Sequence, residues 1–428
     1  MEAKPVTPPF QWTCALSTRV SLEAAVKDVV ERATAALVGP ADLAIVFISS
    51  AFASEYSRLM PLLKEALDSY YDELPAVIGC GGGGVVGTHA DGRTDELEDE
   101  PALSLTLASL PGAQVTPFHI SNGDLPDLDS PPDAWSVLVG VDPQHQPDFV
   151  LLADPALKEI NELLQGLDYA YPGSVKIGGL ASGAAMRSGR VLFYDYGAYG
   201  EGAVGLALTG AVKIDPIVAQ GCRPIGKPFW VTECDRNIVL KVEEQTEPDQ
   251  MSGDGDDRPP LFVLRELIQT LEESDRQLAE EALFVGVARD EFRQTLEPGD
   301  FLIRNLLGMD PSVGALAIGD RIRAGQRIQF HLRDASTSAE DPELLLQRYM
   351  LKASETPDQS KPVGALMFAC LGRGAGLYGE PNFDSGVLRQ VVGPLPVGGF
   401  FCNGELGPVG NTTFVHGYTS VFGLIRPA

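Results

Sequence analysis

One carboxylate and one imidazole stand out in the carboxy-terminal stretch from Val391 to Arg426. Between Arg389 and Arg426 the only formally charged residue is Glu405 and the only histidine is His416, although 21% of the whole chain is charged. So long a stretch with so few charges is normally buried, with glycines where the backbone turns tightly. A buried carboxylate is costly unless it is paired or hydrogen-bonded. Glu405 is therefore predicted to belong to a structural network or to a binding site.

Two cysteines, Cys80 and Cys402, lie in glycine-rich turns and are candidates for a shared site. The six cysteines are scattered without a Cys-x-x-Cys pair, which predicts reduced thiols and a cytoplasmic location. A nucleophilic cysteine needs a base, and His416 is the only histidine near enough in sequence to be considered. An enzyme that uses Cys402 with Glu405, or uses Cys370, stays an alternative. The five histidines are isolated from one another, so no metal site and no catalytic residue are predicted.

Three glycine-rich turns follow strand-like runs, at residues 79–84, 178–183 and 399–405. Such turns expose consecutive backbone N–H groups, which bind anions or carboxylates without basic side chains. If the three segments pack together, their turns would converge on one cavity. The turn residues predicted to line it are Gly79, Cys80, Gly81, Gly179, Ser182, Cys402 and Glu405. The alternative is that each glycine only allows a tight exit from a strand.

The order strand, helix, strand and glycine turn occurs three times. The first copy has strand 43–49, helix 57–70 and a strand from residue 76, and the second has strand 149–153, helix 156–167 and a strand from residue 175. A third, diverged copy has strand 364–369, helix 385–392 and the turn at 399–405. Apolar β-branched runs of this length are typical of strands inside a sheet. The sequence therefore predicts an α/β fold of mixed sheets, in two modules built from repeated units.

The expected domain organisation has three parts. Residues 1–41 form a strand and a helix that belong to the first module, which extends over 42–229, and the second module covers 230–428. Residues 243–260 are acidic, lack aromatic residues, and are predicted to form a mobile loop. A helix is expected over 261–283, strands over 283–288 and 321–333, a helix over 343–351 and a second mobile stretch over 353–362.

Two nucleotide-binding patterns fail on inspection. Residues 221–227 (GCRPIGK) have the glycine spacing of a P-loop, but Pro228 stands where Ser or Thr should ligate magnesium and a helix should begin. Residues 374–379 (GAGLYG) fit the dinucleotide glycine pattern, but Glu380 and Pro381 interrupt the helix that should receive the pyrophosphate. Neither segment is predicted to bind nucleotide.

The net charge of −27 argues against nucleic acid and anionic membranes as partners, because no basic surface is available to displace their counterions. The first twelve residues lack the apolar core of a signal peptide, and no run of eighteen apolar residues predicts a membrane span.

The motifs LAIVFISS, VIGCGGGGVVG and SLTLASLPG, followed by FACLGRGAGLYG, Asp384 and GFFCNGELGPVGNTTFVHGYTSVFGL, resemble FIST-domain proteins from about Asp42 to the end. The resemblance implies an intracellular sensory domain that binds a small ligand, such as an amino acid or a small carboxylate. No output domain is visible, so it implies a stand-alone sensor that signals through a partner protein. The positions that match the family's terminal motif, and are carried over as pocket or core residues, are Arg373, Tyr378, Asn403, Glu405 and His416.

The first glycine loop, GCGGGGVVG, is more glycine-rich than the GCS-like pattern usual in the family. No cofactor is predicted from the residues. Some FIST-like proteins resemble haem-binding nitric oxide sensors, which gives a second functional class. Haem would need an axial ligand in an apolar pocket, and His416 or His119 could supply it.

Overall fold

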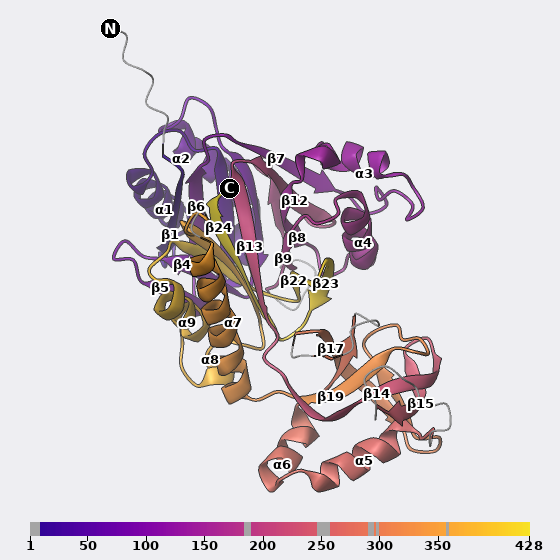
Figure 1. Ribbon diagram of the computed structural model, residues 1–428. Helices are drawn as coiled ribbons and strands as arrows, with labels where there is room; N and C mark the ends of the chain where they lie inside the picture. The colour runs from indigo at the N-terminus through magenta and orange to yellow at the C-terminus, as the bar shows by residue number, and fades with distance from the viewer. Residues whose placement is uncertain (1–8, 184–189, 246–256, 290–294, 297–298, 357–358) are drawn as a thin grey trace. The chain divides into compact units, whose positions relative to one another are not determined.

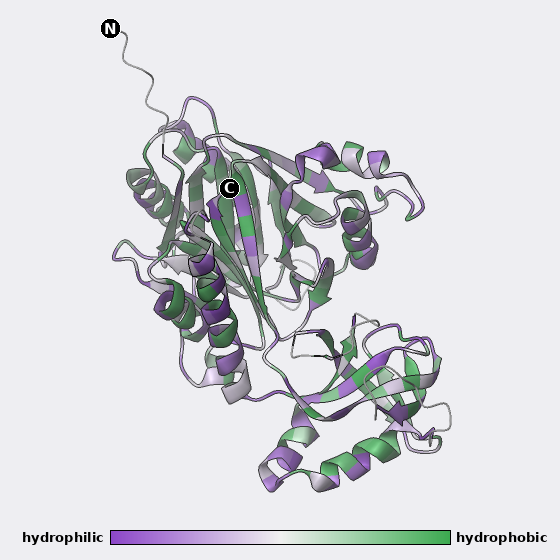
Figure 2. Cartoon of the chain, in the orientation of Figure 1, coloured by the Kyte–Doolittle hydropathy of each residue, from purple (hydrophilic) through white to green (hydrophobic). Residues whose placement is uncertain are grey.

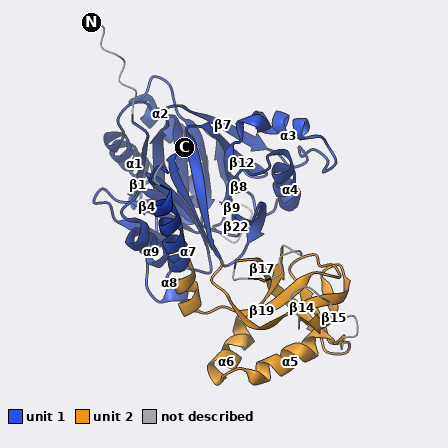
Figure 3. Cartoon of the chain, viewed as in Figure 1, with its two compact units in different colours: residues 1–219, 342–428 blue, residues 220–341 orange. Residues whose placement is uncertain are grey.

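The computed structural model describes residues 9–183, 190–245, 257–289, 295–296, 299–356 and 359–428. The chain forms two compact units (Figures 1 and 3). Unit 1 comprises residues 1–219 and 342–428, and unit 2 comprises residues 220–341. Unit 2 is thus an insertion within the sequence of unit 1.

Unit 1 contains the same succession of elements three times. The first repeat has β1 (Gln11–Ser17), α1 (Leu22–Ala36), β2 (Leu43–Ser49), α2 (Tyr56–Asp68), β3 (Ala76–Gly82), β4 (Gly84–Thr88), β5 (Thr94–Glu98) and β6 (Leu103–Ser109). The second has β7 (Ala113–Ile120), α3 (Pro132–Val139), β8 (Asp148–Ala153), α4 (Ile160–Ala170), β9 (Lys176–Leu180), β10 (Leu192–Tyr194), β11 (Gly197–Tyr199) and β12 (Ala203–Gly210). The third has β13 (Val212–Ala219), α7 (Ala335–Glu355), β20 (Gly364–Cys370), α8 (Ala375–Tyr378), α9 (Phe383–Val392), β21 (Val397–Cys402), β22 (Glu405–Val409), β23 (Thr412–His416) and β24 (Ser420–Pro427). The threefold repetition predicted from the sequence is therefore present.

Each repeat contributes most of one six-stranded sheet and gives a hairpin to another. The strand orders, over the described residues, are β1-β6-β2-β3-β10-β11, β23-β22-β9-β8-β12-β7 and β13-β24-β20-β21-β4-β5. The hairpin β4–β5 of the first repeat thus extends the sheet of the third. The hairpin β10–β11 of the second extends the sheet of the first, and β22–β23 of the third extends that of the second. Each glycine turn is the point where the chain passes from one sheet to the next.

The three sheets enclose a common core, and helices cover their outer faces. In β2, Leu43, Ile45 and Phe47 face the shared core, whereas the alternate residues face α1 and α2. Both faces of this strand are buried, so it is apolar throughout. Figure 2 shows the strands as largely hydrophobic, whereas the helices carry both colours. Ser21 caps α1 by accepting a hydrogen bond from the N–H of Ala24.

Unit 2 is a closed barrel in the order β14-β15-β18-β17-β16-β19. Its elements are β14 (Arg223–Asp235), β15 (Ile238–Glu244), α5 (Pro260–Thr270), α6 (Glu273–Glu281), β16 (Leu283–Ala288), β17 (Phe301–Asp310), β18 (Ala315–Ile318) and β19 (Arg327–Leu332). The chain enters it after β13 and leaves it through α7, so the insertion separates the first strand of the third repeat from the rest of that repeat. The boundary expected between the two sequence modules, at residues 229 and 230, falls inside β14.

Several sequence expectations are corrected in detail. The helix expected over 261–283 is two helices, because the chain is extended at Leu271 and Glu272 between α5 and α6. The helix expected over 343–351 is the centre of the longer α7. Most of the predicted acidic loop, residues 246–256, lies outside the described residues. Its flanks are ordered, because Val242 of β15 pairs with Arg258. The P-loop-like segment lies mostly in β14, which confirms that no helix follows it.

Candidate functional site

Three glycines occupy equivalent positions in the middle of β3, β9 and β21. They pair with Val46, Leu151 and Met367 of the adjacent parallel strands. A Cβ atom on these glycines, Gly79, Gly178 and Gly399, would lie 2.1, 1.8 and 1.9 Å from the carbonyl oxygens of those partners. Real Cβ atoms do not approach so closely, so each strand pair needs glycine here. Gly79 therefore has a packing role, whatever contact with ligand it also makes.

Ser182 joins the three glycine turns. Its hydroxyl accepts a hydrogen bond from the N–H of Gly83 at 2.8 Å and donates to the carbonyl of Phe401. Its own N–H donates to the carbonyl of Gly81 at 3.1 Å. The turns thus converge as expected, and we call residues 81–83, 180–182 and 401–405 the turn junction.

The backbone N–H groups of the turn junction are largely used within the protein. The N–H of Gly81 donates to Val191, that of Leu180 donates to Gly404, and that of Asn403 donates to Leu180, at 3.0, 2.8 and 3.0 Å. The expectation that these amides form an anion nest is therefore wrong for these positions, because an engaged N–H cannot also bind a ligand strongly. Any ligand chemistry at the junction must come from side chains.

The thiols of Cys80 and Cys402 are fully buried beside the junction. Cys402 pairs with Cys370 across β20 and β21, and a Cβ on Gly179 would lie 2.3 Å from its sulfur. Burial raises the pKa of both Cys80 and Cys402 well above the ordinary value. These two thiols are therefore protonated at neutral pH and poorly suited to nucleophilic catalysis.

Glu405 is fully buried at the start of β22, opposite Gly179 of β9 and His416 of β23. Its Oε2 accepts a hydrogen bond from the N–H of Thr419 at 3.1 Å. Its Oε1 is buried and accepts no hydrogen bond from an N–H or O–H group of the described residues, and the Cys370 thiol lies beside the carboxyl group and lowers its pKa. Burial raises the pKa of Glu405 to about 8, although the Thr419 N–H and the nearby Arg373 stabilise the charged form. Glu405 is therefore mostly protonated at neutral pH.

Arg373 and Asp384 form an ion pair in which both side chains are completely buried. Nε and Nη2 of Arg373 donate to the two carboxylate oxygens at 2.8 and 2.9 Å. Tyr378 donates to the same carboxylate at 2.9 Å, and Nη1 of Arg373 donates to the carbonyl of Tyr418 at 3.2 Å. The predicted residues Arg373 and Tyr378 thus share one network, and Arg373 connects it electrostatically with Glu405.

Two further members of this network were not predicted from the sequence. They are Asp384, as the ion-pair partner of Arg373, and Glu96. Glu96 lies in β5, the hairpin supplied by the first repeat, and its Oε1 accepts a hydrogen bond from the N–H of Ser385 at 2.7 Å. Burial, followed by the proximity of Asp384, raises the pKa of Glu96 to about 7. Only the hairpin exchange brings Glu96 here, and in the sequence it lies in an acidic run typical of a solvated surface.

The two histidines considered as haem ligands have other contacts. Nε2 of His416 lies 3.0 Å from the carbonyl oxygen of Gly407, and its ring is buried. The ring of His119 lies against Tyr199, with centroids 4.2 Å apart. An iron bound at Nε2 of His416 would have to replace this hydrogen bond. Among the described residues no group of His, Cys, Asp and Glu is arranged to hold a metal ion.

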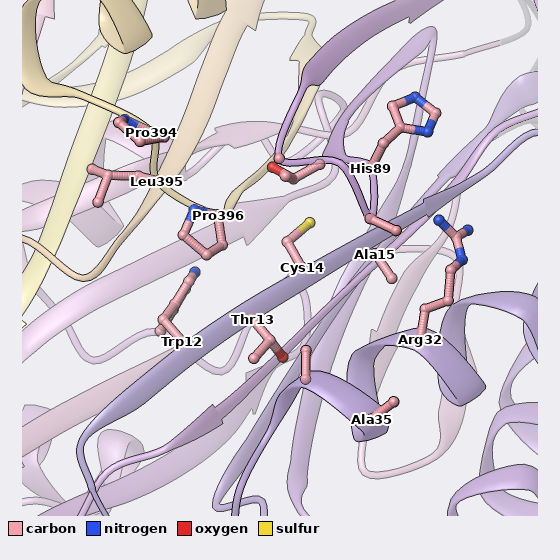
Figure 4. Close-up of a pocket in the computed structure, with 14 residues that line it drawn as sticks. Trp12, Thr13, Cys14, Ala15, Arg32, Ala35, His89, Pro394, Leu395 and Pro396 are labelled. Carbon is pink, nitrogen blue, oxygen red and sulfur yellow. The ribbon is translucent and has the colours of Figure 1, made fainter.

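A cavity of about 550 Å³ lies elsewhere in unit 1 and includes none of the predicted site residues. It is lined by β1, the second half of α1, the turn that joins β4 to β5 and the segment before β21 (Figure 4). No helix in the described part of the chain has the length and apolar character needed to span a bilayer.

Comparison with known proteins gives consistent matches. The FIST N domain model matches residues 42–245, and the FIST C domain model matches residues 260–408. An uncharacterized protein of Mycobacterium tuberculosis is 36% identical over 82% of this chain and 84% of its own length. An uncharacterized protein of Mycobacterium bovis is 32% identical over 89% of this chain and 90% of its own. F-box only protein 22 of Homo sapiens is 30% identical over 29% of this chain and 33% of its own.

Proposed function

Because the chain belongs to the FIST family, whose domains are sensory domains, we propose that it binds a small ligand at the turn junction and signals through a partner protein. The ligand class we propose is an amino acid or another small carboxylate, and the location is the cytoplasm. The residues proposed to form the site are the side chains at the junction, Ser182, Asn403 and Glu405, together with the Arg373 network beneath it.

The observation that carries this proposal is the state of Glu405. A carboxyl group that is fully buried, with one oxygen that has a thiol beside it and no N–H or O–H donor, costs stability, and such costs are typical of functional sites. A protonated Glu405 can donate a hydrogen bond to a ligand carboxylate, and the positive charge of Arg373 favours an anion nearby. Both effects are stronger away from water.

Leu371 controls access to this site in the proposal. Its side chain is 45% exposed, and its N–H donates to the carbonyl of Cys402 at 3.0 Å. Its Cδ2 would lie 2.5 Å from a Cβ placed on Gly83, so it packs directly on that turn. Rotation of this one exposed side chain would uncover the turn at Gly83, which belongs to the junction.

No contact among the described residues supports either alternative function, the haem sensor or the cysteine enzyme. A haem sensor that used His416 would have to break its hydrogen bond to Gly407, and a cysteine enzyme would have to ionise the buried thiol of Cys402. We therefore retain ligand sensing as the single proposed function.

The test is a thermal-shift screen of the purified protein with amino acids and small carboxylates. A compound that raises Tm should do so in the wild type and in the Glu31→Gln control, whose carboxylate is on the surface of α1. It should lose its effect in Glu405→Leu, which has no hydrogen-bond donor, whereas Glu405→Gln still donates through its amide and should keep part of the effect. If no compound changes Tm, or if Glu405→Leu keeps the full shift, ligand binding at the turn junction is wrong.

A further inference from the structure

We propose that the cavity at β1 is a second ligand site, which binds a small organic acid with an apolar body and no amino group. It goes beyond the function proposed above, because it shares no residue with the turn junction. The cavity volume of about 550 Å³ is within the range usual for small-molecule sites. Three features of the cavity lining favour such a ligand: its apolar walls, its hydrogen-bond donors without an acceptor and its charge.

The walls of the cavity are mostly apolar. Trp12, Pro394 and Pro396 supply rigid rings, and Ala35 and Ala36 of α1 leave space beside them. Figure 4 shows the ring of Trp12 with its nitrogen directed toward Pro396. Surfaces of this kind bind an apolar or aromatic body with little loss of side-chain entropy on binding.

The indole of Trp12 offers a hydrogen bond that the protein does not use. Trp12 is 4% exposed, and its Nε1 finds no acceptor among the residues that the structure describes. A buried indole N–H usually has a partner, because leaving it unpaired costs free energy. A ligand with an acceptor beside the ring would satisfy it.

Strand β1 adds main-chain donors, because it is the edge of its sheet. Strand β6 lies between β1 and β2, and the carbonyl of Ala108 in β6 accepts a hydrogen bond from the N–H of Asp42, on the side of β2. The backbone groups of a strand point alternately to its two neighbours, so the N–H and C=O of Thr106 also point toward β2. Cys14, the residue of β1 opposite Thr106, therefore has its N–H and C=O directed away from β6. The carbonyl of Leu16 points the same way and accepts from Nη2 of Arg32 at 2.5 Å. The N–H of Cys14 therefore points out of the sheet edge, on the side where the cavity lies.

The charge of the lining favours an acid over an amine. Among the described residues, no Asp or Glu lines the cavity, and Arg32 is the one lining residue with a permanent charge. Its Nε and Nη2 bind Asp28 and Leu16, which leaves Nη1 without a hydrogen bond to any described residue. His89 lies at the same end of the view in Figure 4, with Nε2 2.9 Å from Asp95. A ligand ammonium group would meet a guanidinium and no lining carboxylate, whereas a ligand carboxylate could bind Nη1.

The test uses four probes that share a phenylethyl group: 3-phenylpropionate, its amide, phenethylamine and phenylalanine. With the full-length protein we expect 3-phenylpropionate to raise Tm by at least about 2 °C at saturation, and phenethylamine to have no effect. Phenylalanine and the amide should bind more weakly than the acid. If no probe raises Tm or shows heat in calorimetry, or if the amine binds as well as the acid, the proposal is overturned.

Variants then locate the site. Ala35→Phe should fill the cavity and abolish binding, whereas Ala24→Phe, on the same exposed side of α1 but outside the lining, should not. Trp12→Phe keeps the ring, removes the N–H and should weaken binding about tenfold. If Ala35→Phe retains the affinity of the wild type, the cavity is not the site. If Glu405→Leu alone removes the binding, the acid belongs to the turn junction, and this inference fails while the proposed function stands.

Discussion

Arg373 and Asp384 lie within unit 1 as a two-point ion pair from which water is completely excluded. Taking two charges out of water costs several kcal/mol each, and only good geometry and further hydrogen bonds offset that cost. The pair has both, since Tyr378 and the carbonyl of Tyr418 complete it. This polar network also joins the third repeat to the hairpin of the first, because the N–H of Ser385, next to Asp384, donates to Glu96.

Replacing Asp384 by Ala should lower the free energy of unfolding by about 3–5 kcal/mol, because Arg373 would keep a buried charge without its counter-ion. Urea unfolding followed by circular dichroism measures this. The surface pair of Lys27 and Glu31 supplies the control, and Glu31→Ala should change stability by less than about 0.5 kcal/mol. Equal effects of the two substitutions would contradict the role of the buried pair.

Removing the hydroxyl of Ser182 should cost about 1–3 kcal/mol, since Ser182→Ala leaves the N–H of Gly83 and the carbonyl of Phe401 without this partner. The comparison is Ser69→Ala, whose hydroxyl bonds to Ala66 at an exposed helix end. A loss at Ser182 no greater than that at Ser69 would show that the hydroxyl does not hold the turns together.

Gly179 and Cys402 should be energetically coupled. Gly179→Ala places a methyl group 2.3 Å from the original position of the Cys402 sulfur and should cost about 1–3 kcal/mol. Cys402→Ala removes that sulfur, so the double variant should recover about 1 kcal/mol or more relative to the sum of the two single changes. Additive effects in a double-mutant cycle would mean that the two positions do not touch.

Stability should fall as the pH rises from about 5 to about 8. The folded protein holds the protons of Glu405 and Glu96 up to about pH 8 and 7, because of burial, whereas unfolded glutamates release them near the ordinary value of 4.5. The folded state therefore binds more protons in this range, and each group contributes a slope of at most about 1.4 kcal/mol per pH unit. Urea titrations at several pH values measure it.

The matched variant for the pH dependence is Glu405→Gln, which is neutral at every pH. Its stability should fall less steeply above pH 5 than that of the wild type, and the remaining slope should decrease again when Glu96→Gln is added. Parallel curves for the wild type and Glu405→Gln would show that Glu405 does not hold its proton in the folded state.

The repeats could be predicted from the sequence because their central strands are buried on both faces. A run such as residues 43–49 is apolar throughout for that reason, and the helices between the strands are amphipathic. The hairpin exchange could not be predicted, since an apolar pattern fixes which face of a strand is buried but not which sheet receives it. The position of Glu96 beside Asp384 depends on that exchange, so Arg373 and Tyr378 could be predicted as site residues but Glu96 could not.

The cavity at β1 left no signal in the sequence for a similar reason. Its walls include alanines, prolines and a tryptophan from four separate segments, and no spacing in the sequence connects these segments. The barrel of unit 2 was also missed. Strands such as β15 and β17 mix buried and exposed residues, and the insertion after β13 interrupts a repeat whose remaining elements resume only at α7.

The exchange of hairpins has a consequence for how the protein is made. No repeat can complete its own sheet, because each needs two strands from another repeat. Strand β24 (Ser420–Pro427) lies between β13 and β20, so the sheet of the third repeat closes only after residue 427 has left the ribosome. Unit 2, which is continuous in sequence, can fold before that. We therefore expect the barrel to fold early during synthesis, and unit 1 to fold late and as one cooperative body.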